Sequence, residues 1–346
     1  MLHVVKAWLV AILVVGACKA PAAIPLDAPA SPWSMGSNLP VPRLEPGVAA
    51  LGQSIVVVGG WDTGVEAGLQ VTTRVDVYDT TQGTWSQLPD APVARHHVQL
   101  ATIGTTVYLL GGLDGTADVN NDYPARGDCY AIDTGVANAM WQPIAAIPTG
   151  FERGSAGVVV TPPRVYLLGG ASTTDAIASN IFYDSIADAW TTGALPDLPA
   201  ARSHPAAMRR ASDGTFIVVG GLAGLASDTA EADVYWLTSD QQTSTGMWVS
   251  MTAMPEERGG CAYGVVQDQL LCAGGEAGMS ALTYMQGYDS INDVWNSYPF
   301  LPMPRAGVQG AAVADSLYVV GGAEALVFEP TDSLYIFSLD DTAPTN

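Results

Sequence analysis

The stretch SIVVVGG, residues 54–60, joins a run of β-branched residues to a Gly-Gly pair. The same combination of apolar run and Gly-Gly occurs six times, at Gly59-Gly60, Gly111-Gly112, Gly169-Gly170, Gly220-Gly221, Gly274-Gly275 and Gly321-Gly322. Short apolar runs closed by glycine predict strands that are buried on both faces. The mean spacing of about 52 residues is a fixed period, which indicates a repeat architecture.

Aromatic and basic residues recur in register with the glycines. A Tyr follows each pair, at Tyr78, Tyr130, Tyr183, Tyr235, Tyr288 and Tyr335. A Trp comes next in five repeats, at Trp85, Trp141, Trp190, Trp248 and Trp295. An Arg then follows behind one or more prolines in most repeats, at Arg95, Arg153, Arg202, Arg258 and Arg305.

This order of Gly-Gly, Tyr, Trp and a unit near 50 residues resembles the kelch motif, and the resemblance covers residues 32–340. It implies an all-β protein, a six-bladed kelch-type β-propeller in which each repeat is one four-stranded blade. The physical argument agrees, because one blade has two apolar faces and needs a neighbour on each side.

The two ends of the repeat region predict how the ring closes. The last repeat has Gly321-Gly322 and Tyr335 but lacks a Trp, whereas Trp33 and Arg43 stand before the first Gly-Gly. The ten residues from Trp33 to Arg43 match the interval from Trp85 to Arg95. We therefore expect the N-terminal segment to supply the outermost strand of the last blade.

The N-terminal residues have the pattern of an export signal. Residues 1–17 contain one cationic stretch and an apolar run, which predicts a signal peptide, and Cys18 follows as in a bacterial lipobox. Residues 18–31 would then be a lipidated Cys and a Pro/Ala-rich tether, and residues 341–346 a tail. We expect an outer-membrane lipoprotein or a periplasmic or extracellular protein, with membrane contact only through the lipid. Ordinary secretion with an incidental Cys is the alternative.

The net charge limits the classes of molecule that the protein could bind. The formal net charge is −21, and the expected propeller contains no lysine, so nucleic acid is an unlikely partner on electrostatic grounds.

Export permits a disulfide between Cys261 and Cys272, which flank an expected hairpin. A turn at Gln267-Asp268 would make the pair diagonal, and this favours two buried thiols. No CxxC or zinc-type cluster occurs.

The directions of the strands predict which end of the propeller carries the candidate binding residues. Each Arg precedes an innermost strand, and the next strand returns to Gly-Gly, so the arginines and the longest loops emerge together. A ring of Arg43, Arg95, Arg153, Arg202, Arg258 and Arg305 could grip an acidic ligand bidentately. Alternatively, the arginines pair with acids of neighbouring blades, such as Glu66, Glu231, Glu276 or Glu324. The regular repetition favours this structural role, and most clearly for Arg153.

Residues that break the repeat are better binding candidates. His96, His97 and His204 lie beside the expected channel mouth, and Trp61 next to Asp62 could stack on a sugar ring. With Arg43, Arg95, Arg202, Arg258 and Arg305 they form the candidate ligand site. Asp118, Asn120 and Asp122 have the alternating oxygens of a Ca²⁺ loop, with a solvated acidic loop as the alternative.

The sequence therefore predicts a monomeric binding module for a glycan or a protein, without a cofactor and without another metal site. It contains no GxSxG elbow, HExxH helix or P-loop. The alternative is a sugar mutarotase or epimerase, because periplasmic sialic acid epimerases are also six-bladed kelch rings and resemble this chain in architecture and export. That resemblance assigns no catalytic residue.

Overall fold

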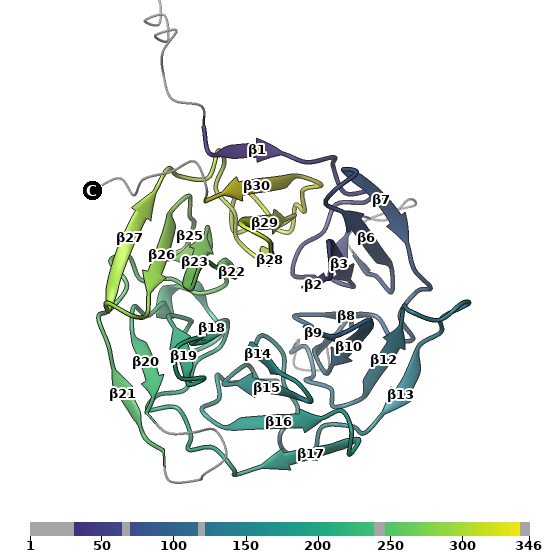
Figure 1. Ribbon diagram of the computed structural model, residues 1–346, viewed down its shortest axis with the longest axis horizontal. Helices are drawn as coiled ribbons and strands as arrows, with labels where there is room; N and C mark the ends of the chain where they lie inside the picture. The colour runs from purple at the N-terminus through teal and green to yellow at the C-terminus, as the bar shows by residue number, and fades with distance from the viewer. Residues whose placement is uncertain (1–30, 64–69, 117–121, 239–245, 340–346) are drawn as a thin grey trace, which may run out of the picture. The chain divides into compact units, whose positions relative to one another are not determined.

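The computed structural model describes residues 31–63, 70–116, 122–238 and 246–339. From Pro32 onward the chain forms one compact unit, in which four-stranded antiparallel sheets surround a central channel (Figure 1). Apart from the 3-10 turn η1 (Ser227–Thr229), the regular elements of the described residues are strands. None of the described residues belongs to a helix long and apolar enough to cross a bilayer.

Six sheets form the blades of this propeller. The strands of blades 1 to 3, from the channel outward, are β2 (Gly47–Leu51), β3 (Ser54–Val58), β6 (Val75–Asp79) and β7 (Thr84–Gln87); β9 (Gln99–Ile103), β10 (Thr106–Leu110), β12 (Cys129–Asp133) and β13 (Gln142–Ile144); β14 (Gly157–Thr161), β15 (Arg164–Leu168), β16 (Asn180–Asp184) and β17 (Ala189–Thr192). Those of blades 4 to 6 are β18 (Ala206–Arg209), β19 (Phe216–Val219), β20 (Val234–Leu237) and β21 (Trp248–Ser250); β22 (Ala262–Val266), β23 (Gln269–Ala273), β26 (Met285–Asp289) and β27 (Val294–Tyr298); β28 (Gln309–Val313), β29 (Ser316–Val320), β30 (Leu334–Ser338) and β1 (Trp33–Met35). Short two-stranded pairs lie beyond the Gly-Gly pairs: β4 (Trp61–Asp62) with β5 (Gln70–Val71), β8 (Arg95–His96) with β11 (Leu113–Asp114), and β24 (Glu276–Ala277) with β25 (Ser280–Ala281).

The predicted fold and ring closure are confirmed. Strand β1 pairs antiparallel with β30, with Trp33 opposite Phe337, so the N-terminal segment completes the sixth blade (Figure 1). A closed ring leaves each blade with a neighbour on both sides, which protects the apolar faces and the sheet edges.

The apolar core lies between the blades. Six main clusters of buried side chains each combine residues of two adjacent blades. In one of them Val56 and Val58 of β3 pack against Leu109 and Ile132 of blade 2. Because the apolar area is divided among interfaces rather than within blades, the free energy of unfolding depends on ring closure.

The repeated tryptophans fasten each blade to the preceding one. Each indole N–H donates to a backbone carbonyl that lies in the preceding blade or just after its last strand: Trp33 to Pro299, Trp85 to Ser37, Trp141 to Pro89, Trp190 to Ala145, Trp248 to Pro196 and Trp295 to Thr252. In blades 1, 3 and 5 the Trp follows the Tyr by seven residues, and the two lie opposite each other, as in Tyr183 and Trp190, whose ring centroids are 5.4 Å apart. The periodic Trp is therefore a structural residue.

The expectation of two buried thiols at Cys261 and Cys272 is wrong. The two residues form a disulfide, with Cα atoms 5.6 Å apart. The turn falls at Gln267-Asp268 as predicted, and Cys272 lies opposite Tyr263 in the register. Cys261 precedes the first paired residue of β22 and follows Gly260, which has a left-handed backbone, so the strand alternation does not fix the direction of its side chain.

Candidate functional site

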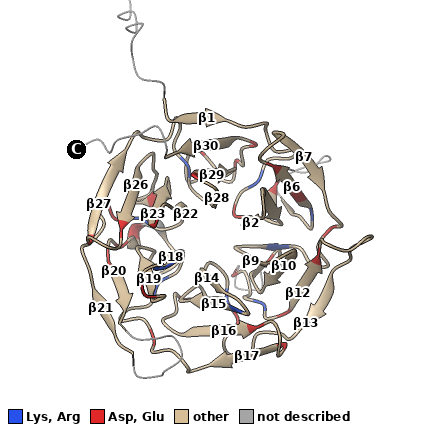
Figure 2. Ribbon diagram, in the orientation of Figure 1, with Lys and Arg blue, Asp and Glu red and all other residues tan. Residues whose placement is uncertain are grey.

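The six arginines belong to the scaffold. Their exposed fractions range from 0 to 8%, and each side chain bonds to the third strand of its own blade or to the residues just before it. The partners are Asp76 for Arg43, Asp128 for Arg95, Ser179 for Arg153, Asp233 for Arg202, Gln286 for Arg258 and Ser333 for Arg305. The basic residues accordingly gather toward the inner parts of the blades (Figure 2). This burial leaves little guanidinium surface for a carboxylate ligand.

The expected pairing with acids of neighbouring blades also needs correction. Glu231 and Glu324 approach Arg202 and Arg305 at 3.8 and 3.5 Å, but both acids belong to the same blade as their arginine. The charged group that acts on Glu276 is Glu45 and not an arginine. Glu66 lies outside the described residues. At the arginines the contact between blades is made by the backbone, because each Arg carbonyl accepts the N–H of the second Gly of the preceding Gly-Gly, as from Gly60 to Arg95 and from Gly112 to Arg153.

Two residues after each Arg, the chain forms a ring around the mouth of the channel. These residues are Glu45, His97, Ser155, His204, Gly260 and Gly307, and all have φ between 52° and 61°. Backbone hydrogen bonds connect successive members: His97 N–H to Glu45, Ser155 to His97, His204 to Ser155, Gly260 to His204, and Glu45 to Gly307. We call these six residues the mouth ring.

Four members of the mouth ring are not glycine. A left-handed backbone costs a residue with a Cβ about 1 kcal/mol or more, whereas glycine adopts it freely. Blades 5 and 6 use Gly260 and Gly307, and blades 1 to 4 carry Glu, His, Ser and His at the same strained position. Backbone strain of this kind is concentrated at functional sites, which makes these four side chains candidates for a role beyond folding.

The mouth-ring side chains converge on one another. His97 Nε2 lies 3.1 Å from Glu45 Oε2, and the rings of His97 and His204 are 4.9 Å apart. Ser155 Oγ lies 3.0 Å from His204 Nε2. One ligand atom each from Glu45, His97 and His204 lie within 4.8 Å of one another.

Neighbouring groups fix the tautomers of the histidines. Ser203 Oγ donates to the carbonyl of Gly224 and lies 3.0 Å from His204 Nδ1, so this nitrogen donates to Ser203 and Nε2 carries a lone pair. His96 Nε2 donates to the carbonyl of Asp114, which leaves His96 Nδ1 to accept from His97 Nδ1 at 2.5 Å. His97 Nε2 therefore also presents a lone pair, toward Glu45.

Burial governs the charge of this cluster. Desolvation lowers the pKa of His97 and of His204 to about 4, and desolvation together with the neighbouring His97 lowers the pKa of His96 to about 2. The three imidazoles are neutral at pH 7. Burial raises the pKa of Glu45, and burial followed by repulsion from Glu45 raises the pKa of Glu276 to about 7.

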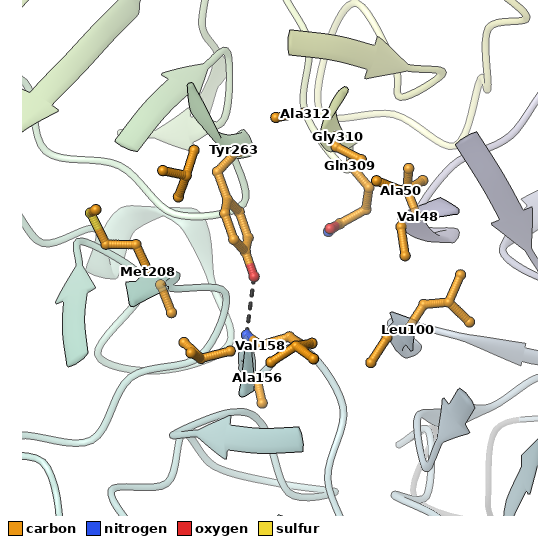
Figure 3. A pocket seen from close by; sticks show the side chains of 18 of the residues that line it. Val48, Ala50, Leu100, Ala156, Val158, Met208, Tyr263, Gln309, Gly310 and Ala312 are labelled. Atoms are coloured by element: carbon orange, nitrogen blue, oxygen red, sulfur yellow. Dashed lines mark hydrogen bonds between the residues drawn. The ribbon is translucent and has the colours of Figure 1, made fainter. Parts of the chain in front are cut away.

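Below the mouth ring lies a channel of about 430 Å³, lined mainly by apolar side chains such as Val48, Leu100 and Met208. Tyr263 of blade 5 reaches across it, and its hydroxyl accepts the N–H of Val158 in blade 3 at 3.1 Å (Figure 3). Val158 and Tyr263 each come three residues after a mouth-ring residue, Ser155 and Gly260. Tyr263 therefore lies across the channel on the inner side of the mouth.

Trp61 does not lie where a sugar could stack on it. Only 6% of its surface is exposed, and its ring packs against His96, Tyr123 and Phe328 at centroid distances of 4.9, 5.3 and 5.7 Å. Asp62 is buried beside Arg43, at 4.0 Å. Both residues support the loops around the mouth. Asp118 and Asn120 of the Ca²⁺ candidate, like Cys18, lie outside the described residues, and Asp122 is described without them.

The loops that follow Gly-Gly in blades 4 to 6 expose apolar side chains around the mouth. The exposed fractions are 43% for Leu225, 69% for Met279, 47% for Val327 and 61% for Phe328. We call the end of the propeller that carries the Gly-Gly pairs, the mouth ring and these loops the Gly-Gly face. It combines an apolar rim with a polar centre.

Sequence reasoning found His97 and His204 but missed Glu45, Ser155 and Glu276. Glu45 and Ser155 could have been found from the sequence, because they occupy the position two residues after Arg, where the last two repeats have Gly260 and Gly307. Aligning the repeats at that position would have grouped them with the histidines.

Comparison with known proteins agrees with the repeat and the ring. Residues 42–92 match the family described as Kelch motif. The chain is 30% identical over 309 residues to Kelch-like protein terF of Aspergillus terreus, covering 84% of this chain and 64% of that protein. It is 28% identical over 270 residues to F-box/kelch-repeat protein At1g80440 of Arabidopsis thaliana, covering 73% and 68%.

A solved structure titled "Structure of YjhT" superposes with a TM-score of 0.72 at 16% identity, covering 89% of this chain and 98% of that chain. At that identity the likeness concerns the fold alone. The chain spans less than two thirds of the length of the terF protein, so the similarity extends to the propeller and not to the activity of whole relatives. The matched motif, the six in-register repeats and the closed ring show that this chain is a six-bladed propeller of the kelch type.

Proposed function

We propose that this protein is an exported binding module that holds a protein partner on its Gly-Gly face. The observation that supports it is the rim of exposed apolar side chains, Leu225, Met279, Val327 and Phe328, on loops of three adjacent blades. Large apolar side chains exposed on neighbouring loops are a feature of interaction sites on soluble proteins. Kelch propellers commonly bind protein partners, which agrees with this proposal.

The chemistry of the face favours a protein over a glycan. Aliphatic rim residues suit apolar side chains of a partner, whereas Trp61, the residue best suited to stack on a sugar, is buried. With a formal net charge of −21, the chain favours a partner whose contact surface is apolar and basic. We propose that it acts as a monomer.

The test compares two ends of the same molecule. One variant combines Leu225→Ser, Met279→Ser and Phe328→Ser. The matched control combines Met140→Ser, Ile186→Ser and Ile291→Ser, residues that are 62, 84 and 59% exposed at the opposite end. Affinity capture from the envelope fraction of the native host, quantified by mass spectrometry, should show about tenfold less of a specific polypeptide for the first variant only.

Equal recovery by both variants would contradict a site on the apolar rim. A glycan array run in parallel separates the alternatives. Saturable glycan binding that the rim variant retains would replace the protein partner with a sugar.

Export and lipid attachment are part of the proposal. The support is the signal-like sequence of residues 1–17, the Cys that follows it, and the disulfide between Cys261 and Cys272, since disulfides persist mainly in oxidising compartments. We propose that Cys18 is acylated and anchors the chain to a membrane.

A second candidate function is acid–base catalysis on a small sugar, as in a mutarotase or epimerase. The observation that favours it is Glu276, whose pKa of about 7 beside His204 and Glu45 suits a general acid or base at neutral pH. Mutarotation of reducing sugars followed by NMR tests it. Acceleration that Glu276→Gln abolishes would support catalysis, and a wild-type rate equal to that in buffer would exclude it for those sugars.

A further inference from the structure

Glu45, His97 and His204 present three ligand atoms to one point at the channel mouth, where Glu45 Oε2 and His97 Nε2 face each other as two acceptors. Glu45 Oε2 is buried and accepts no hydrogen bond from any described residue. It nevertheless lies 3.1 Å from His97 Nε2, which carries a lone pair in the tautomer fixed by His96. Two acceptors this close repel each other unless a cation or a proton lies between them.

The groups behind the histidines match those that orient metal ligands. A metal-binding imidazole usually donates its other N–H to a protein acceptor, which fixes its tautomer and direction. His204 donates to Ser203, which in turn donates to the carbonyl of Gly224. His97 donates to His96, which in turn donates to the carbonyl of Asp114. Both Nε2 atoms thereby present a lone pair, that of His97 toward Glu45 and that of His204 toward the hydroxyl of Ser155.

We propose that Glu45 Oε2, His97 Nε2 and His204 Nε2 bind a divalent transition-metal ion of the Zn²⁺ class, with an open coordination position facing the channel. Two imidazoles and one carboxylate are a ligand set that Zn²⁺ uses, and imidazole disfavours Ca²⁺ and Mg²⁺. Ligands around a tetrahedral Zn²⁺ lie about 3.3 Å apart, given Zn–N bonds of about 2.0–2.1 Å. The present separations are 3.1 Å and up to 4.8 Å, so the ligand atoms would have to move by at most about 1.5 Å relative to one another.

The surroundings leave room for a further ligand. Ser155 Oγ lies 3.0 Å from His204 Nε2 and could rotate away when the metal binds. The channel of about 430 Å³ begins at His97, Ser155 and His204 and gives water or a small ligand access to the open position. The site is independent of the apolar rim on which the protein-binding proposal rests.

The repeat supplies variants that remove the ligands without disturbing the backbone. Glycine occupies the mouth ring in blades 5 and 6, so Glu45→Gly, His97→Gly and His204→Gly suit the left-handed conformation. The matched control is Glu329→Gln, an exposed carboxylate on the same face. Ser203→Ala removes only the group that orients His204.

The experiment is calorimetric titration of the full chain with Zn²⁺ after removal of metals by a chelator, with Co²⁺ absorption as a spectroscopic readout. We expect one Zn²⁺ per chain, affinity reduced at least about 100-fold by the triple glycine variant and about tenfold by Ser203→Ala, and no change for Glu329→Gln. The Co²⁺ spectrum should show imidazole coordination that the triple variant loses.

Two results would overturn the proposal. One is the absence of saturable Zn²⁺ binding in the wild-type chain. The other is equal binding by the wild type and a triple glycine variant whose circular dichroism and melting temperature show that it is folded, since the metal would then bind elsewhere.

Discussion

At the scale of single residues, position in the repeat distinguishes structural from functional side chains. Arg153 occupies a position that all six blades share, and its guanidinium donates to the carbonyls of Phe151, Gly169 and Ser179. Glu45, His97 and His204 occupy a shared position too, but their side chains depart from the glycine found in blades 5 and 6. The first kind of residue should affect stability, and the second kind should affect binding.

Replacing Arg153 should therefore destabilise the ring. Its side chain is fully buried, and burial lowers its pKa to about 10, while hydrogen bonds to backbone carbonyls hold the guanidinium in place. Arg153→Ala would leave the carbonyls of Gly169 and Ser179 without a donor and open a cavity. We expect a loss of about 3–5 kcal/mol in the free energy of unfolding, measured by denaturant titration. A loss below 1 kcal/mol would mean that the scaffold does not need the arginine.

Trp61 provides a second residue-scale prediction, and here the structure reverses the expectation from sequence. Trp61 packs against His96, Tyr123 and Phe328, so Trp61→Ala should lower the free energy of unfolding by about 3–5 kcal/mol. Thermal and denaturant melts of purified protein measure the effect. If the variant were as stable as the wild type, the aromatic packing around the mouth would not contribute to the fold.

At the scale of elements, strand β1 is the piece that closes the ring. A chain shortened to begin at residue 39 lacks β1 and exposes the edge of β30, whereas a chain beginning at residue 32 keeps it. We expect the shorter chain to melt at a lower temperature and to associate through the open edge, because unpaired strands recruit others. Light scattering and calorimetry compare the two. Identical melting and mass would contradict the role of β1.

The turn between β16 and β17 makes a pH-dependent contact between blades. Asp188 accepts the N–H of Ala145 in blade 2 and the hydroxyl of Tyr183, and these bonds, the first most strongly, lower its pKa below 3.8. The unfolded state binds a proton first, so this stabilisation is full above about pH 4 and is lost as the pH falls through the folded-state pKa. Asp188→Asn should weaken the acid dependence of the melting temperature between pH 5 and 2. Parallel pH profiles for the variant and the wild type would rule out this contribution.

At the scale of the whole molecule, the fold was predictable and most of the site was not. Six copies of Gly-Gly and Tyr, five of them followed by Trp, specify the blades, and the missing Trp of the last repeat identifies Trp33 as its replacement. The site depends on convergence across blades 1, 2 and 4, which only an alignment of the repeats at the position two residues after each Arg would have indicated. The disulfide was missed for a similar reason, since Cys261 lies just outside the strand whose alternation was used to judge it.

The proposed anchor also belongs to this scale. Cys18→Ser should release the protein from membranes of the native host, because acylation requires the thiol. Fractionation of the membrane and soluble compartments, followed by immunoblotting, measures the shift. If the wild type and the variant were found equally in the soluble fraction, lipid attachment would be contradicted. That result would not test export.

The functional role of the mouth ring is tested most directly by the stability of the chain that carries Glu45→Gly, His97→Gly and His204→Gly together, measured in the presence of a chelator. Glycine relieves three left-handed residues of strain and adds a comparable entropy to the unfolded state. We predict a free energy of unfolding within about 1 kcal/mol of the wild type, or above it. A loss of about 3 kcal/mol or more, as expected for Trp61→Ala, would show that these side chains serve folding and would contradict their assignment to function.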